Sequence, residues 1–118
     1  MPNVEEMLQQ CAGYILEKKG QDIISLDLRD ISSMADYFLL CTVGNTPQAK
    51  AVADYLKEKL AEQEILPLRT EGYKEGRWIL MDYGPLIIHI FQQDERLYYN
   101  LERLWGEAVK TAYGPKEE

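Results

Sequence analysis

The chain has 118 residues, of which 46% are hydrophobic and 28% are charged. This length fits one domain whose core needs neither disulfides nor a structural metal, and no apolar run approaches the roughly 18 residues of a membrane span. The 20 acidic and 13 basic side chains give a net charge of -7. That charge disfavours direct binding to nucleic acid, whose phosphates require lysine and arginine, and favours a basic protein partner.

The first fifteen residues include Glu5 and Glu6 and contain no lysine or arginine. They therefore match neither a secretory signal nor an arginine-rich transit peptide, and a cytoplasmic location is predicted. Cys11 and Cys41 are thirty positions apart and form no C-x-x-C motif. We predict two buried thiols, one in a helix and one in a strand, rather than a disulfide or a metal-binding pair.

The first half of the chain predicts two helices that flank two strands. Asn3 can cap the first helix, and Gly20 can end it. Residues 23–28 and 37–43 are predicted strands, the second of them buried. Thr46 is a predicted cap for the second helix, with Pro47 in its first position. The apolar residues at helical spacing are Val4, Met7, Leu8, Cys11 and Ile15 in the first helix, and Ala49, Val52, Ala53, Leu56 and Leu60 in the second.

The second half predicts three strands and a final helix. The strands cover residues 66–71, 78–83 and 86–91, with glycines between them. Asp94 is the expected cap of a helix whose apolar face holds Leu97, Leu101, Leu104, Trp105 and Ala108. The complete order predicts a single α/β (or α+β) domain over residues 1–118, with helices flanking one mixed five-stranded sheet.

Residues for catalysis are scarce. The only histidine, His89, lies in the middle of an apolar strand, which favours a structural or recognition role over catalysis. No Asp-x-Asp or Asp-x-Glu pair exists for two-metal chemistry, and there is no P-loop or G-x-G-x-x-G motif. The turn from Gly44 to Pro47 can present backbone N–H groups to an anion, but this signal alone is weak. We therefore predict no enzyme activity, no cofactor and no metal site.

The strand over residues 78–83 suggests a surface for protein binding. Alternation places Trp78, Leu80 and Asp82 on one side and Ile79, Met81 and Tyr83 on the other. Aromatic anchors beside polar groups are typical of interface centres. An equally good interpretation makes Trp78 an ordinary core residue and lets Asp82 cap the turn at Gly84. Both interpretations stay open on spacing alone, whereas Trp105 is predicted to lie in the core.

The sequence resembles the ribosomal silencing factors of the Iojap family. The shared residues are short groups in family order across nearly the whole chain: 27–29, 35–38, 44–46 with Gln48, 71–72, 78–84, 89–91, Tyr99, 101–102 and 104–105. The chain departs from the family pattern in two places. The family often has Ser-Gly-Asn-Ser where this chain has Thr42-Val43-Gly44-Asn45-Thr46. It usually has an acidic residue after the glycine of the later turn, at the position of Pro85.

The resemblance implies a nucleotidyltransferase-like fold that lacks the catalytic carboxylates. It also implies a translational repressor that binds the large ribosomal subunit through the fourteenth protein of the universal naming, on the face that meets the small subunit. Subunit association is then blocked sterically when nutrients are scarce. The implied contact residues are Trp78, Leu80, Asp82, Tyr83 and His89. The resemblance also implies a homodimer. Two other functions stay open as alternatives to translational repression: a nucleotide-binding or nucleotidyl-transfer enzyme that uses the turn from Gly44 to Pro47, and a dimeric adaptor with no ribosomal role.

Overall fold

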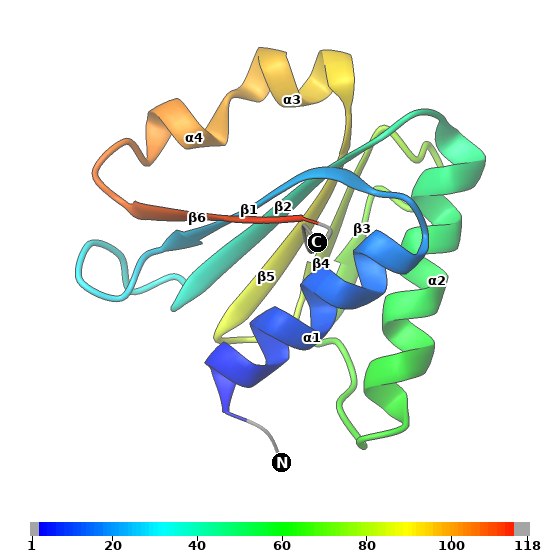
Figure 1. Ribbon diagram of the computed structural model, residues 1–118, viewed down its shortest axis with the longest axis horizontal. Coiled ribbons are helices and arrows are strands. Elements are labelled where there is room, and N and C mark those ends of the chain that lie inside the picture. The colour runs from blue at the N-terminus through cyan, green and yellow to red at the C-terminus, as the bar shows by residue number, and fades with distance from the viewer. Residues whose placement is uncertain (1–2, 115–118) are drawn as a thin grey trace.

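The computed structural model describes residues 3–114. Runs of two or three strands separate the helices through most of the chain (Figure 1). In chain order the elements are α1 (Val4–Glu17), β1 (Gln21–Asp27), β2 (Tyr37–Val43), α2 (Thr46–Ala61), β3 (Arg69–Glu71), β4 (Trp78–Asp82), β5 (Leu86–Gln92), α3 (Gln93–Tyr99), α4 (Leu101–Leu104) and β6 (Val109–Tyr113).

The strands form one mixed sheet in the order β3-β4-β5-β2-β1-β6. Strands β2 and β5 are parallel and all other neighbours are antiparallel. Every residue of β2 is buried, as predicted for residues 37–43. The prediction of five strands was wrong, because residues 109–113 form a sixth strand along the outer edge of β1. The third strand is also shorter than predicted: Leu66 and Leu68 lie exposed before it begins.

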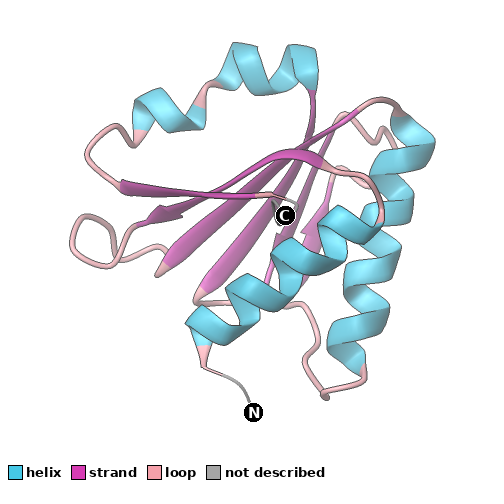
Figure 2. Ribbon diagram, in the orientation of Figure 1, coloured by secondary structure: helices cyan, strands magenta, loops and turns pink. Residues whose placement is uncertain are grey.

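The helices cover both faces of the sheet (Figures 1 and 2). Helices α1 and α2 pack on one face, over a core that contains most of the buried apolar residues. The short helices α3 and α4 cross the other face above a smaller core. Cys11 and Cys41 are free and fully buried in the first core, as predicted, and burial raises the pKa of each thiol to about 12. Within residues 3–114, no helix has both the length and the apolar character to cross a membrane.

Side-chain caps begin both long helices. The Asn3 carboxamide accepts a hydrogen bond from the Glu6 amide at 2.8 Å, as predicted. The predicted cap of α2 was one residue off, because Asn45 accepts from the Gln48 amide at 2.8 Å. The Thr46 hydroxyl instead donates to the Glu75 carbonyl and accepts from the Gln92 amide group. Thr46 thus joins the start of α2 to the connection between β3 and β4.

The predicted final helix is interrupted at Asn100. This residue has a left-handed backbone (φ 43°), which asparagine tolerates better than most side chains. The break lets the chain turn toward the sheet edge that β6 occupies. Asp94 does not cap α3: the cap position is Gln92, two residues earlier. Leu97 and Leu104 are exposed rather than buried. Trp105, predicted to lie in the core, is only partly buried and packs against the second core.

Gly72 directly follows β3 and lies against the backbone at the start of β4. Its φ is +77°, and a Cβ atom there would collide with the backbone carbonyl of Trp78. We expect Gly72→Ala to lower the free energy of unfolding by about 1 to 3 kcal/mol. The matched control is Gly13→Ala in α1, where an added Cβ meets nothing within 4 Å and should stabilise the helix by about 0.5 to 1 kcal/mol. Urea unfolding measures both, and equal effects would contradict this explanation.

Candidate protein-binding site

Strand β4 presents three side chains on the face away from α1 and α2. Trp78, Leu80 and Asp82 are half-buried there, whereas Ile79 and Met81 are buried in the first core. The sequence predicted this alternation correctly. We call Trp78, Leu80 and Asp82 the β4 patch. It combines two apolar side chains with a carboxylate, which suits contact with a protein better than contact with a small molecule.

The indole of Trp78 is fixed in orientation. Its Nε1 donates a hydrogen bond to His89 Nδ1 at 3.0 Å. The ring stacks on Phe91 with centroids 5.0 Å apart, and the Tyr99 ring lies 4.5 Å away on α3. Trp78 is therefore partly a core residue and partly a surface residue, which joins the two interpretations that spacing left open. A side chain held in this way loses little conformational entropy on binding.

His89, on the neighbouring strand β5, holds Trp78 by a hydrogen bond and does not face solvent. It is 3% exposed, and burial lowers its pKa to about 3, so the imidazole is neutral. Because Nδ1 accepts from Trp78, the ring proton is on Nε2, which has no hydrogen-bond partner among the described residues. A buried neutral imidazole with this geometry positions the indole. The structure thus agrees with a structural role for His89 rather than a catalytic one.

The low pKa of His89 makes stability depend on pH. In the unfolded chain this histidine titrates near 6.5, whereas in the folded chain its pKa is about 3. Its contribution is complete above pH 6.5 and is lost as the pH falls toward 3, because the unfolded state binds the proton first. Between about pH 7 and about pH 5, wild type should lose about 2 kcal/mol more stability than His89→Gln. Urea titrations at both pH values measure the free energy of unfolding of the two proteins. An equal loss in wild type and in His89→Gln would rule out a buried neutral imidazole.

Asp82 is engaged within the chain. Its Oδ1 accepts from the Gly84 amide at 2.8 Å, which confirms that it caps this turn. Its Oδ2 accepts from Arg69 Nε at 3.2 Å across the β3–β4 pair. Arg69 also pairs with Glu71 at 3.0 Å. The β4 patch therefore has a charged rim on the side of β3.

Tyr83 does not lie with the β4 patch. It is on the opposite face of the sheet, 7% exposed, in the core beneath the two long helices. Burial raises its pKa above the usual value, and its hydroxyl has no partner among the described residues. The expectation that Tyr83 and Trp78 anchor a partner side by side therefore does not fit the structure. Alternation along the strand already indicated the opposite face; only the family resemblance had grouped the two rings.

The sequence did not predict the contribution of the C-terminal segment. Tyr99 contacts Trp78, and Tyr98 packs edge-on against Tyr99 with centroids 5.0 Å apart. Both tyrosines are exposed. They fell outside the apolar face of the predicted continuous helix, and nothing in that pattern brought α3 over β4. The useful signal was Asn100, a residue that often ends helices in a left-handed conformation.

The possible anion site at the start of α2 is occupied by the protein's own side chains. The Gly44 amide donates to Gln48 Oε1 at 2.7 Å, and the Gln48 amide donates to Asn45 Oδ1 at 2.8 Å. These amides are therefore not available to a phosphate. In residues 3–114, no three histidine, cysteine or acidic side chains come together as metal ligands. A nucleotidyl-transfer enzyme, the alternative hypothesis, gains no support from this geometry.

Comparisons with known proteins identify the family of the chain. A family model described as "Ribosomal silencing factor during starvation" matches residues 1–118. The ribosomal silencing factor RsfS of Bacillus subtilis is 42% identical over 106 residues, which cover 90% of each protein. RsfS of Halalkalibacterium halodurans is 42% identical over 104 residues, 88% of this chain and 89% of that protein. The chloroplast protein Iojap of Zea mays is 28% identical over 79% of this chain and 40% of its own length.

Two crystal structures have the same fold. A Chromobacterium violaceum protein superposes with a TM-score of 0.86 at 29% identity, over 98% of this chain and 92% of the other. A Bacillus halodurans protein superposes with a TM-score of 0.78 at 40% identity, over 86% of this chain and 94% of the other. The family model covers all residues of the sequence, and the bacterial relatives match it over most of their length. The chain therefore belongs to the family of ribosomal silencing factors.

Proposed function

We propose that this protein represses translation by binding the large ribosomal subunit and physically blocking its association with the small subunit. The contact is with a ribosomal protein on the face that meets the small subunit, the fourteenth in the universal naming. The family supports a ribosome-associated role, and no bond needs to be made or broken. The description of the matching family, a silencing factor during starvation, supports repression when nutrients are scarce.

The observation that carries this proposal is the fixed, half-buried indole of Trp78. A hydrogen bond to His89 and the stack on Phe91 hold the ring on the outer face of β4. Leu80 lies next to it, and the Asp82–Arg69 pair adds a charged edge. Rigid aromatic anchors with a polar rim are the usual centre of a protein interface. In this proposal Trp78 and Leu80 contact the partner, and Asp82 supplies charge. The buried side chains of His89 and Tyr83 support the strand that carries the β4 patch from its two sides.

Charge supports a basic partner. The net charge of -7 accelerates encounter with a positively charged protein, and it opposes contact with exposed RNA. This attraction is long-range and screened by salt, with a Debye length near 8 Å at physiological ionic strength. We therefore expect association with the ribosomal protein to slow as salt is added. Dissociation depends on the apolar contact and should change less.

Binding to separated subunits tests the proposal. Labelled protein is mixed with purified large or small subunits, and the bound fraction is measured after sedimentation. We expect saturable binding to large subunits, competition by the isolated fourteenth protein, and no saturable binding to small subunits. Absence of binding to large subunits, or equal binding to both, would contradict the proposal.

Self-association bears on the same surface. A homodimer that buries the β4 patch would compete with the ribosomal protein, because one apolar surface cannot serve both contacts at once. Sedimentation of the protein alone and with the isolated ribosomal protein separates the cases. We expect any dimer formed through this patch to dissociate as the ribosomal protein is added. A dimer that persists in the complex must use another surface.

A further inference from the structure

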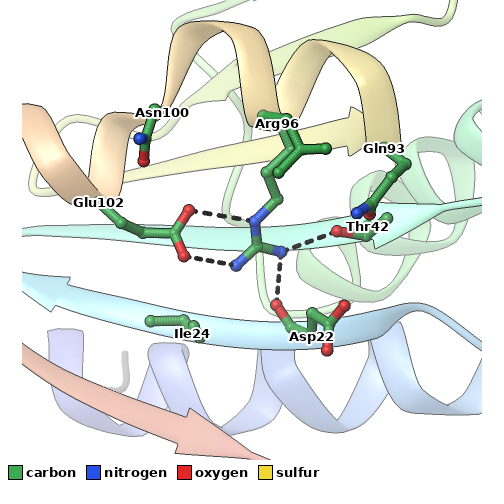
Figure 3. A pocket seen from close by; sticks show the side chains of 8 residues that line it. Asp22, Ile24, Thr42, Gln93, Arg96, Asn100 and Glu102 are labelled. Carbon is green, nitrogen blue, oxygen red and sulfur yellow. Dashed lines mark hydrogen bonds and ion pairs between the residues drawn. The ribbon is translucent and has the colours of Figure 1, made fainter.

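Arg96 is the most connected buried polar side chain of the second face. It is 7% exposed and extends from α3 toward β1, β2 and α4 (Figure 3). Its Nη1 donates to the Asp22 carbonyl and, at 2.9 Å, to the Thr42 hydroxyl. Its Nε and Nη2 donate to the two carboxylate oxygens of Glu102, at 3.2 and 3.3 Å. A single guanidinium thus joins two strands and two helices.

The backbone of β1 is shaped to receive this side chain. The pairing of β1 with β2 shifts register between Gln21 and Ile24, so an extra residue is inserted there. Asp22 lies in this bulge with φ 48°, a conformation that is unfavourable for a residue other than glycine. Bulges commonly redirect one group out of the ladder. Here the Asp22 carbonyl accepts from Arg96.

Arg96 is not a site for an external anion. A guanidinium has five N–H donors, and the four hydrogen bonds above leave one. The neighbouring hollow of about 340 Å³ is also lined by the carboxylates of Asp22 and Glu102, which repel anions. We therefore look for the role of Arg96 in the segments that its hydrogen bonds hold together.

What Arg96 holds is the segment over residues 93–104, which we call the α3–α4 arch. Its helices have seven and four residues, too short to be stable alone. Arg96 and Leu101 are its only buried side chains, whereas Leu97, Tyr98 and Leu104 are 66%, 81% and 70% exposed. Apolar packing therefore fixes the arch weakly. Two of the hydrogen bonds of Arg96, to the Asp22 carbonyl and the Thr42 hydroxyl, attach the arch to strands β1 and β2. A further polar contact, the Arg77–Glu95 ion pair at 3.1 Å, lies near the start of α3 and is largely exposed on its Arg77 side.

The arch places Tyr99 against the β4 patch. Tyr99 is the last residue of α3, less than one turn after Arg96, and its ring centroid is 4.5 Å from that of Trp78. The position of this ring therefore depends on the position of α3. We propose that Arg96 is a positioning residue for ribosomal binding: it fixes the arch so that Tyr99 completes the contact surface around Trp78. This inference rests on the function proposed above.

A double-mutant cycle of Arg96→Met and Tyr99→Ala tests the inference. Dissociation constants are measured for purified large ribosomal subunits, at a temperature where circular dichroism shows every variant folded. Each single substitution should weaken binding by about tenfold. The double variant should be no weaker than the weaker single variant, because both substitutions remove the same positioned ring. Multiplied effects, or wild-type binding by Arg96→Met, would overturn the inference.

Fluorescence of Trp78 reports the same ring contact without the ribosome. In a Trp105→Phe background Trp78 is the one remaining tryptophan, and excitation at a wavelength that tyrosine does not absorb selects its emission. Arg96→Met and Tyr99→Ala should each shift its emission to longer wavelength and increase quenching by acrylamide, because each exposes the indole. Arg29→Met is the matched control: it removes an arginine whose ion pairs, with Asp27 and Glu5, are exposed. Its spectrum should equal that of wild type, and an unchanged spectrum in Arg96→Met would also overturn the inference.

Two further variants cover the remaining outcomes. If Arg96→Met does not fold, Glu102→Gln takes its place in the cycle. This substitution removes the negative charge that pairs with Arg96 and keeps a hydrogen-bond acceptor. We expect the same non-additive pattern of dissociation constants, with a smaller loss of affinity. Trp78→Ala separates this inference from the proposed function. Wild-type binding by Trp78→Ala would contradict the binding surface itself. Lost binding by Trp78→Ala with unaffected Arg96→Met would contradict only the role of Arg96.

Discussion

Trp78→Glu should abolish most binding to large ribosomal subunits, with a loss of about 2 to 4 kcal/mol. The substitution removes the aromatic anchor of the β4 patch and puts a charge in its place. The new carboxylate would lie where the indole packs against the rings of Phe91 and Tyr99, a position that costs a charge part of its hydration. Titration of labelled protein with purified subunits measures the loss as a rise in the dissociation constant of roughly 30-fold to 1,000-fold.

A second charge at an exposed apolar position serves as the control for Trp78→Glu. Leu66 is 67% exposed in the connection between α2 and β3 and is not one of the residues of the β4 patch. Leu66→Glu changes the net charge equally, so it should bind large subunits nearly as wild type does. Circular dichroism and the unfolding midpoint establish that both variants are folded. Equal binding by folded Trp78→Glu and Leu66→Glu would remove Trp78 from the contact surface.

Arg96→Met should lower the free energy of unfolding by about 3 kcal/mol. Removing one partner of a buried ion pair usually costs about 3 to 5 kcal/mol, since the other charge stays without compensation. The lower end applies because Glu102 is only partly buried, its side chain being 26% exposed, and can recover some hydration. The Thr42 hydroxyl and the Asp22 carbonyl also lose their donor. Urea unfolding at neutral pH measures the change.

The double variant Arg96→Met with Glu102→Met identifies the cause of that loss. Replacing both members of a buried pair by apolar side chains is often nearly neutral, because no charge is left uncompensated. We therefore expect it to recover a substantial part of the stability that Arg96→Met loses. A double variant less stable than the single one would show that packing of the arginine stem, rather than its charge, sustains the arch.

The sequence predicted most of the first core and little of the second face. The spacing of apolar residues identified α1 and α2, because it repeats over several helical turns. A continuous apolar run identified the buried strand β2. Alternation also placed Trp78 and Tyr83 on opposite faces of β4. These features depend on neighbours along the chain, so local pattern is enough to find them.

The C-terminal errors have a common physical origin. The spacing of Leu97, Leu101 and Leu104 fits one amphipathic helix, but the left-handed Asn100 interrupts it and leaves two of these leucines exposed. Attachment of the arch depends on Arg96, whose partners are distant in sequence, as with Thr42 and Asp22. Pairing of β6 with β1 spans a similar separation. A single sequence carries no local sign of such long-range contacts.

The most direct test of the steric mechanism is association of purified ribosomal subunits, followed by light scattering. Small and large subunits are mixed in the presence of wild-type protein or Trp78→Glu, each in severalfold excess. We expect wild-type protein to prevent formation of whole ribosomes and Trp78→Glu to permit it. Normal association in the presence of excess wild-type protein would contradict the steric mechanism.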